Sequence, residues 1–341
     1  MIVAPRFWWR QRPGAAALAL LPAAALWSAV AGRRMRRAPS FRAELPVICI
    51  GNFVVGGAGK TPTALAVAEI VKRLGFRPGF LTRGYGGTIT GVHLVDAGRD
   101  AATRVGDEAL LLAASGPVVV APHRPDGVPL LEAAGADCII MDDGFQNPSL
   151  AKDFSLVVVD GVVGIGNGKV LPAGPLRAPL ATQMARADAV LIVGEGEAGD
   201  RVLRRAARAG RLVLRAALEP VAAAELGQGR FLAFAGIGRP EKFYASLTAA
   251  GIDVAATRSF PDHHAFTNDD AAQLLARAEA EGLRLVTTTK DHARLRGTHA
   301  ARLALAQKSE VFRVRMHFAD EAALANTIAG ALRTFSGGRE G

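Results

Sequence analysis

The chain has 341 residues, of which 50% are hydrophobic and 21% are charged. This composition excludes an intrinsically disordered chain, and the length predicts about two domains. The net charge is +10, but residues 1–43 hold eight arginines and no acidic residue. The remainder therefore carries only two net positive charges, which argues against a nucleic-acid-binding protein and favours an anionic membrane surface as the partner of the basic end.

Cys49 and Cys138 lie in apolar runs, so we interpret them as reduced core thiols.

Residues 14–32 form an uncharged stretch with arginines on both sides. It has three interpretations: a cleaved signal peptide, a membrane span, or a helix that lies in the membrane interface. The arginines that follow it at once oppose translocation, and the alanine-rich composition weakens the spanning interpretation. We favour an interfacial helix with Trp8, Trp9 and Trp27 at headgroup depth.

From Pro46 onward, short apolar runs alternate with helical patterns. Strands are predicted at 47–50, 78–82, 117–121, 137–141, 155–160, 189–193 and 211–215. Helices are predicted at 62–74, 107–115, 126–135 and 198–209. Continuous apolar strands that alternate with helices predict an α/β fold with a mostly parallel sheet covered on both faces.

Strand character is lost near residues 216–230, and a second α/β series then begins. Its predicted strands are 231–235, 252–258, 283–288 and 311–315, and its predicted helices are 240–250, 268–281 and 320–334. We therefore divide the chain into a basic membrane-associating segment (1–43), an α/β core (44–220), a smaller α/β domain (221–335) and a flexible tail (336–341). The sequence Gly236-Ile237-Gly238 lacks a third glycine at the dinucleotide-binding spacing, so we interpret it as a strand–helix turn.

The strongest local signal is a glycine-rich loop between the strand at 47–50 and the helix at 62–74. It reads Val54-Val55-Gly56-Gly57-Ala58-Gly59-Lys60-Thr61. Backbone N–H groups in such a loop bind phosphates, the lysine reaches the β- and γ-phosphates of ATP, and the threonine hydroxyl is a ligand for Mg²⁺. Val54 departs from the usual pattern, which has glycine there. The alternative is an ordinary glycine-rich turn, but the strand–loop–helix context favours a nucleotide site.

Two acids, Asp142 and Asp143, follow the apolar strand at 137–141. A carboxylate at the end of a neighbouring strand can hold Mg²⁺ beside a phosphate-binding loop. Because Asp143-Gly144 is also a common turn dipeptide, the pair alone is weak evidence. With Thr61 and the loop, it predicts a metal–nucleotide site.

Several motifs together closely resemble tetraacyldisaccharide 4′-kinase, the lipid A 4′-kinase of Gram-negative bacteria. The resemblance covers about residues 5–330, and its motifs occur in the expected order in both predicted domains. They are Val55–Pro62, Thr82-Arg83-Gly84-Tyr85-Gly86, Val105-Gly106-Asp107-Glu108-Ala109, Asp142-Asp143-Gly144-Phe145-Gln146, Leu171-Pro172-Ala173-Gly174-Pro175-Leu176-Arg177, Phe260-Pro261-Asp262-His263-His264 and Thr288-Thr289-Lys290-Asp291.

The resemblance implies a P-loop NTPase-like core and transfer of the γ-phosphate of ATP to the 4′-hydroxyl of a tetraacylated glucosamine disaccharide 1-phosphate, which makes lipid IVA. It also implies a location at the cytoplasmic face of the inner membrane, because the basic hydrophobic N-terminus resembles that family's membrane anchor. A loop without the first glycine is a trait of the family, so Val54 agrees with this interpretation.

Residue roles follow from the matching positions. The resemblance implies Asp107 as the catalytic base, His263 as its partner and Lys60 as the cation at the transferred phosphate. Arg83 and Arg177 lie in family motifs, and we expect them to contact phosphates of ATP or of the lipid. Ala178 and Ala109 depart from the family, which commonly has Glu and Pro there.

Two other functions are weighed against this one. A membrane-surface ATPase of the partitioning type has a similar loop, but usually has a lysine where this chain has Val55, and it leaves the other motifs unexplained. A non-enzymatic nucleotide-binding adaptor needs no base, so Asp107 and His263 would have no role in it. We therefore predict an ATP- and Mg²⁺-dependent lipid kinase.

Overall fold

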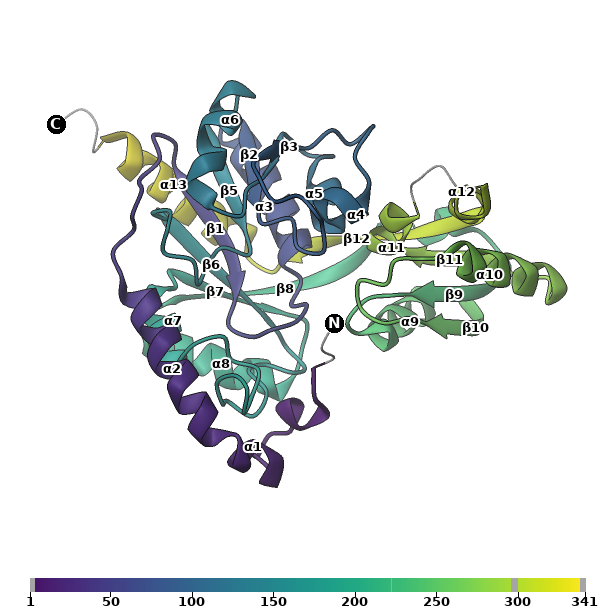
Figure 1. Cartoon of the computed structure of the whole chain (residues 1–341), viewed down its shortest axis with the longest axis horizontal. Helices are drawn as coiled ribbons and strands as arrows, with labels where there is room; N and C mark the ends of the chain where they lie inside the picture. The colour runs from purple at the N-terminus through teal and green to yellow at the C-terminus, as the bar shows by residue number, and fades with distance from the viewer. Residues whose placement is uncertain (1–3, 222, 296–299, 338–341) are drawn as a thin grey trace.

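A single mixed sheet runs through the computed structural model, which describes residues 4–221, 223–295 and 300–337 (Figure 1). In the described residues this sheet has twelve strands in the order β10-β9-β11-β12-β8-β7-β6-β1-β5-β2-β4-β3. The strands are β1 (Val47–Asn52), β2 (Pro78–Thr82), β3 (His93–Leu94), β4 (Val118–Val120), β5 (Cys138–Asp142), β6 (Phe154–Asp160), β7 (Ala189–Val193), β8 (Leu212–Val221), β9 (Arg230–Ala235), β10 (Asp253–Ser259), β11 (Arg284–Thr288) and β12 (Ser309–Phe318). Neighbours are parallel except in the pairs β3–β4 and β8–β12, so the predicted mostly parallel α/β fold is confirmed.

The larger lobe is built on β1 to β7 and has helices on both faces of the sheet. One face is covered by α3 (Lys60–Arg73), α5 (Asp107–Leu112) and α13 (Glu321–Gly337), whose apolar residues share one buried cluster. The other face is covered by η2 (Arg124–Gly127), α6 (Val128–Ala133), α7 (Leu180–Arg186) and α8 (Glu197–Arg208). Strands β1, β5, β6 and β7 are buried along their whole length, which is why their sequences are apolar runs instead of alternating patterns.

The smaller lobe holds β9, β10 and β11 with the helices α9 (Pro240–Ala249), α10 (Asn268–Ala280), α11 (Thr289–Arg294) and α12 (Ala300–Lys308). Two buried clusters lie on the two faces of these strands. In Figure 1 the smaller lobe lies beside the larger one and is joined to it by the strands β8 and β12.

The junction between the lobes corrects one expectation. Residues 216–221 continue β8 as a strand and pair antiparallel with β12, from Ala216 opposite Phe318 to Val221 opposite Arg313. The sequence pattern fails here because side chains along this part of β8 are only partly covered, so they form no continuous apolar run. Short elements were also missed, namely α4 (Ala102–Val105), α7, α11, α12 and β3.

Helix α13 returns to the larger lobe, although the sequence places it in the smaller domain. Leu324, Ile328 and Leu332 belong to the same buried cluster as residues of α3 and β1. The chain thus leaves the larger lobe through β8 and re-enters it through β12. The division into domains stays a prediction, and these contacts favour assigning 320–335 to the core.

The N-terminal segment forms η1 (Arg6–Trp9), α1 (Ala15–Ala19) and α2 (Leu21–Arg36), which lie along one side of the larger lobe (Figure 1). No helix among the described residues is long and apolar enough to cross a membrane. Trp8 differs from the expectation of a headgroup position: it is 8% exposed, and its Nε1 donates a hydrogen bond to the Pro172 carbonyl at 2.9 Å. Leu26, Trp27 and Val30 of α2 are exposed.

We predict that Leu324→Ala lowers the free energy of unfolding by about 2–5 kcal/mol, because it leaves a cavity between α13 and α3. Leu303→Ala is the control, since Leu303 on α12 is 39% exposed and should cost less than about 1 kcal/mol. Urea denaturation of both variants measures the difference. Equal losses would contradict the packing of α13 on the larger lobe.

Candidate functional site

The glycine-rich loop joins the end of β1 to the start of α3. Gly56 and Gly59 have φ values of +114° and +91°, a region that side-chain-bearing residues rarely adopt. Gly59 caps α3, so Lys60 and Thr61 open the helix, and they are 8% and 3% exposed. A helix start with a buried lysine behind a glycine turn is an anion-binding arrangement.

Val54 occupies the place of the first glycine because no positive φ is needed there. Its side chain is buried, and it forms an isolated antiparallel bridge with Leu176. The N–H of Val55 donates to the Pro175 carbonyl at 2.9 Å. The first half of the loop is therefore fixed by the segment 170–177.

Asp142, at the end of β5, is fully buried, and neither carboxylate oxygen has a hydrogen-bond partner among the described residues. Burial and the charge of Glu108 raise the pKa of Asp142 to about 7, although Lys60 acts in the opposite direction. A carboxylate in this state favours a cation beside it. Asp142 thus fits the chemistry of a Mg²⁺ ligand.

Asp143 differs, because its carboxylate is already paired. The Arg177 guanidinium donates to both of its oxygens at 2.9 and 3.0 Å, and the Lys60 Nζ lies 3.8 Å away. Burial alone would raise the pKa of Asp143, but Lys60 and Arg177 lower it to about 2. The Nε of Arg177 also donates to the Val54 carbonyl at 3.1 Å. Arg177 therefore holds Asp143 beside the phosphate loop.

Two further arginines follow the neighbouring strands β2 and β4. Arg83 is exposed just beyond the end of β2. Arg124, which sequence reasoning missed, is 2% exposed, donates to the Ala121 carbonyl at 2.6 Å, and has an Nε without a partner among the described residues. Burial lowers the pKa of Arg124 to about 10, against the opposing charge of Asp143. Arg124 therefore adds a buried positive charge that interacts with Asp143 and Asp142.

Polar contacts also hold the chain around Ala178, the position at which the sequence departs from the expected Glu. Ala178 is fully buried, and its carbonyl accepts a hydrogen bond from the Gln183 side chain at 2.7 Å. Gln183 Nε2 also donates to the Phe53 carbonyl at 3.2 Å, while Gln146 donates to Gln183 Oε1 at 2.9 Å and to the Asn52 carbonyl at 2.7 Å. The two glutamines thus tie the end of β1 to the neighbouring loops.

Asp107 opens α5, and its side chain is 3% exposed. Its Oδ2 lies 3.3 Å from His263 Nδ1 and accepts a hydrogen bond from Arg294 Nε at 2.8 Å. Burial would raise the pKa of Asp107, but the hydrogen bond to His263 and the charges of Lys290 and Arg294 hold it below its usual range. The structure therefore brings together Asp107 and His263, which lie 156 positions apart in the sequence.

His263 lies in the loop between β10 and α10 and has a φ of +57°. Its ring contacts that of Tyr85 edge to face, with centroids 5.2 Å apart. The neighbouring His264 faces away, since its Nε2 lies 2.9 Å from Asp270, the acid of the capping box of α10. Only one of the two adjacent histidines thus belongs to the site.

Charges of opposite sign meet where the lobes face each other. The larger lobe contributes Asp107, Glu108 and Asp160, and the smaller lobe contributes the cations. Lys290 Nζ lies 2.7 Å from Glu108, and Asp160 is paired with two residues near the start of α9, at 2.9 Å with Arg239 and 3.1 Å with Lys242.

Glu108 links this interface to the phosphate loop. The charge of Lys290 lowers its pKa despite burial, and Lys60 adds to the effect. The two halves of the predicted site, on the loop and on α5, are therefore adjacent.

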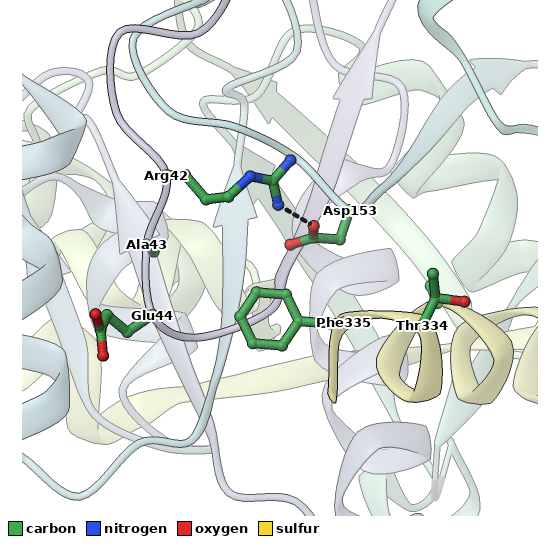
Figure 2. A pocket seen from close by; sticks show the side chains of 7 residues that line it. Arg42, Ala43, Glu44, Asp153, Thr334 and Phe335 are labelled. Atoms are coloured by element: carbon green, nitrogen blue, oxygen red, sulfur yellow. Dashed lines mark hydrogen bonds and ion pairs between the residues drawn. The ribbon is translucent and has the colours of Figure 1, made fainter. Parts of the chain in front are cut away.

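A surface hollow of about 670 Å³ lies elsewhere (Figure 2). It is lined by residues just before β1 and β6 and by the end of α13, and Arg42 pairs there with Asp153 at 2.8 Å. This is the amino edge of the parallel strands. The phosphate loop follows the carboxyl end of β1, where ligands of open parallel sheets bind.

Comparison with known proteins identifies the family. The model of the tetraacyldisaccharide-1-P 4′-kinase family matches residues 16–333. This chain belongs to that family. The tetraacyldisaccharide 4′-kinase of Brucella anthropi is 49% identical over 332 residues, covering 97% of each chain, and that of Brucella ovis is 53% identical over 292 residues, covering 86% of this chain and 85% of its own.

A solved structure agrees with both fold and family. The LpxK of Aquifex aeolicus, in a crystal structure in complex with ATP, matches with a TM-score of 0.72 and 25% identity, over 93% of this chain and 99% of its own. These findings confirm the family and the class of ATP-dependent kinase that the motifs predicted. The roles of individual residues stay predictions.

We predict that replacing Asp142 or Asp143 with the uncharged residue Asn changes the Tm in opposite directions in metal-free buffer at pH 8. The pKa of Asp142 is raised, so its stabilising contribution is present below about pH 4 and is lost as the pH rises through about 7. Asp142→Asn should therefore raise the Tm at pH 8, by at least ~2 °C, and by less at pH 5.

Asp143→Asn is the matched control. The pKa of Asp143 is lowered, so its stabilising contribution is present at both pH values, and its removal should lower the Tm at both. Differential scanning calorimetry measures the four values. A fall in Tm for Asp142→Asn at pH 8 would contradict the prediction, because it would show that other groups already stabilise the ionised Asp142 carboxylate in the folded protein.

Proposed function

We propose that this protein transfers the γ-phosphate of ATP to the 4′-hydroxyl of a tetraacylated glucosamine disaccharide 1-phosphate and so forms lipid IVA. The observation that carries the proposal is the position of the Asp107–His263 pair. It lies at the junction of the lobes, next to Glu108 and the phosphate loop, in a chain of this kinase family. A nucleotide-binding protein without transfer activity has no need of such a pair.

The phosphate loop, residues 54–61, would bind the nucleotide through its backbone N–H groups. Lys60 would offset negative charge that develops on the transferred phosphoryl group. Arg177 would hold Asp143 beside the phosphate loop, because its guanidinium donates hydrogen bonds to both the Asp143 carboxylate and the Val54 carbonyl. Arg83, which is exposed, remains the better candidate for direct contact with a phosphate of the substrates.

Asp142 and the Thr61 hydroxyl are the groups we expect to hold Mg²⁺, with Asp143 as a further candidate. Asp142 fits because its buried oxygens lack partners among the described residues. The described chain has no group of three or more His, Cys, Asp or Glu side chains that could hold a metal. Two protein ligands with substrate phosphates suit Mg²⁺, which when bound neutralises charge on the β- and γ-phosphates.

The acceptor hydroxyl is a weak nucleophile, so the reaction needs a group that takes its proton. The Asp107–His263 pair would supply it. Because Asp107 belongs to the larger lobe and His263 to the smaller one, the pair is complete only when the two lobes are together. We therefore infer that the smaller lobe closes the active site.

For the reaction, we predict that the wild type transfers ³²P from γ-labelled ATP to tetraacyldisaccharide 1-phosphate in detergent micelles. Lys60→Ala and Asp107→Ala should each lower kcat by about 10²–10⁴-fold, since each removes charge stabilisation or the proton acceptor. His264→Gln, next to His263 but outside the site, should keep near-normal activity. ATP hydrolysis without labelled lipid would instead favour the membrane-surface ATPase, and no consumption of ATP would favour an adaptor.

We also propose that α1 and α2 lie on the cytoplasmic face of the inner membrane. Leu18, Leu26 and Val30 are 52%, 70% and 61% exposed. Ala24, Gly32 and Met35 of α2 are buried, as expected for a helix packed on the protein by one side only. The arginines near the end of α2 would contact anionic headgroups.

For the membrane, we predict that the double variant Leu26→Glu/Val30→Glu moves the protein from vesicles to the supernatant in sedimentation with anionic phospholipid vesicles. Each charge makes burial of this face in the interface unfavourable. Leu303→Glu, on the smaller lobe, is the control and should sediment like the wild type. These point variants are preferable to deletion of residues 1–40, because Trp8 and Met35 are part of the folded core. Unchanged sedimentation of the double variant would refute the proposal.

A further inference from the structure

The carbonyl groups at the start of the phosphate loop are held by side chains from other segments of the larger lobe. Those of residues 52, 53 and 54 accept hydrogen bonds, in that order, from Gln146 Nε2 at 2.7 Å, Gln183 Nε2 at 3.2 Å and Arg177 Nε at 3.1 Å. These three donors act on the first part of the loop, before its glycines begin.

The tip of the loop lacks support from packing. Gly56 and Gly57 are exposed, and apart from their chain neighbours no atom of the described residues lies within 4 Å of the place that a Cβ would take at either glycine. Within the described chain one hydrogen bond reaches these two residues, from Asn52 Nδ2 to the Gly56 carbonyl at 3.0 Å. The position of the tip therefore depends on Asn52.

Asn52 is a rigid base for this contact. It is the last residue of β1, lies opposite Val158 of β6, and is fully buried. Its Oδ1 is buried too and has no hydrogen-bond partner among the described residues. Because a buried polar atom without a partner lowers stability, the stability of the fold does not by itself explain an asparagine here.

The bond from Asn52 sets the direction of the next N–H group. The Gly56 carbonyl and the Gly57 N–H belong to one trans peptide unit, in which they point in opposite directions. The Gly57 N–H is therefore turned away from Asn52 and from the end of β1. The backbone N–H groups of residues 56–59 have no acceptor among the described residues. Successive free donors just before a helix start suit the oxygens of a phosphate chain.

We propose that Asn52 is a positioning residue for the nucleotide, a role that rests on the proposed function and specifies how its ATP site is formed. The Asn52 amide holds the Gly56 peptide so that the N–H groups of residues 56–59 face the phosphates of ATP. Asn52 lies two positions before Val54. A loop without the usual first glycine is thus closed by a side chain from the end of β1.

The experiment is calorimetric titration of ATP with Mg²⁺ into the full-length wild type, Asn52→Ala and Asn52→Asp in detergent micelles. Asn52→Ala should raise the Kd for ATP by about 5–10-fold, which corresponds to the loss of one hydrogen bond. Asn52→Asp is similar in shape, but it removes the donor and adds a negative charge near the phosphates, so it should raise this Kd by about 100-fold. In steady-state assays the KM for ATP should rise, while the KM for tetraacyldisaccharide 1-phosphate should not change.

Thr287→Val is the matched control. It removes a buried hydrogen bond of the smaller lobe, from Thr287 Oγ1 to the Phe234 carbonyl at 2.8 Å. This variant should lower the Tm and leave the Kd for ATP unchanged. Asn52→Ala should lower the Tm by no more than the control does, because it also removes the unpartnered Oδ1.

A wild-type Kd for ATP in both Asn52 variants would overturn the proposal. A rise in both KM values together, or a fall in Tm far beyond that of the control, would overturn it as well, because Asn52 would then be structural. Asn52→Asp keeps the test valid if Asn52→Ala fails to fold. A wild type that binds ATP but phosphorylates no lipid would instead refute the proposed transfer reaction and leave the role of Asn52 intact.

Discussion

The site depends on the pairing of buried charges across the two lobes. Asp107 of the larger lobe is buried and Glu108 is partly buried, and a carboxylate withdrawn from water without a partner is costly. Arg294 and Lys290 of the smaller lobe supply those partners. Removal of one member of a buried ion pair typically lowers the free energy of unfolding by about 3–5 kcal/mol. Contact between the lobes therefore depends on the charges of these residues, and the charges in turn depend on that contact. Because Asp107 and Glu108 belong to one lobe and Arg294 and Lys290 to the other, neither lobe alone completes these pairs.

The sheet topology makes this apposition possible. The strands β8 and β12 pair antiparallel over six residues from each strand and join the larger lobe to the smaller one, so the two lobes share one sheet. Helix α13 then packs on the larger lobe beside α3, which begins at the phosphate loop. The smaller lobe is thus an insertion between two long strands, and His263 and Arg294 reach Asp107 from it.

The sequence was informative where the physical requirement is local. A loop with φ values of +114° and +91° strongly favours glycine, and a strand buried on both faces favours apolar residues, so the phosphate loop, β1 and β5 were found by pattern. Arg294 was missed because its role depends on Asp107, 187 residues away, and no local pattern distinguishes it from a surface arginine. The motif at 288–291 marked the right segment, and Arg294 follows Asp291 by one helical turn. The end of β8 was missed because half-covered strands have no distinctive pattern.

The segment 170–177 connects the proposed membrane face to the site. The indoles of Trp8 and Trp27 donate to the carbonyls of Pro172 and Arg177, at 2.9 and 3.0 Å. The Arg177 side chain in turn holds Asp143 and the Val54 carbonyl of the phosphate loop. The helix α2, which we propose to rest on the membrane, is therefore hydrogen-bonded to the same short segment that contacts the nucleotide loop. If α2 rests on the membrane as proposed, these hydrogen bonds would hold the phosphate loop at a fixed distance from a bilayer that contains the acyl chains of the substrate.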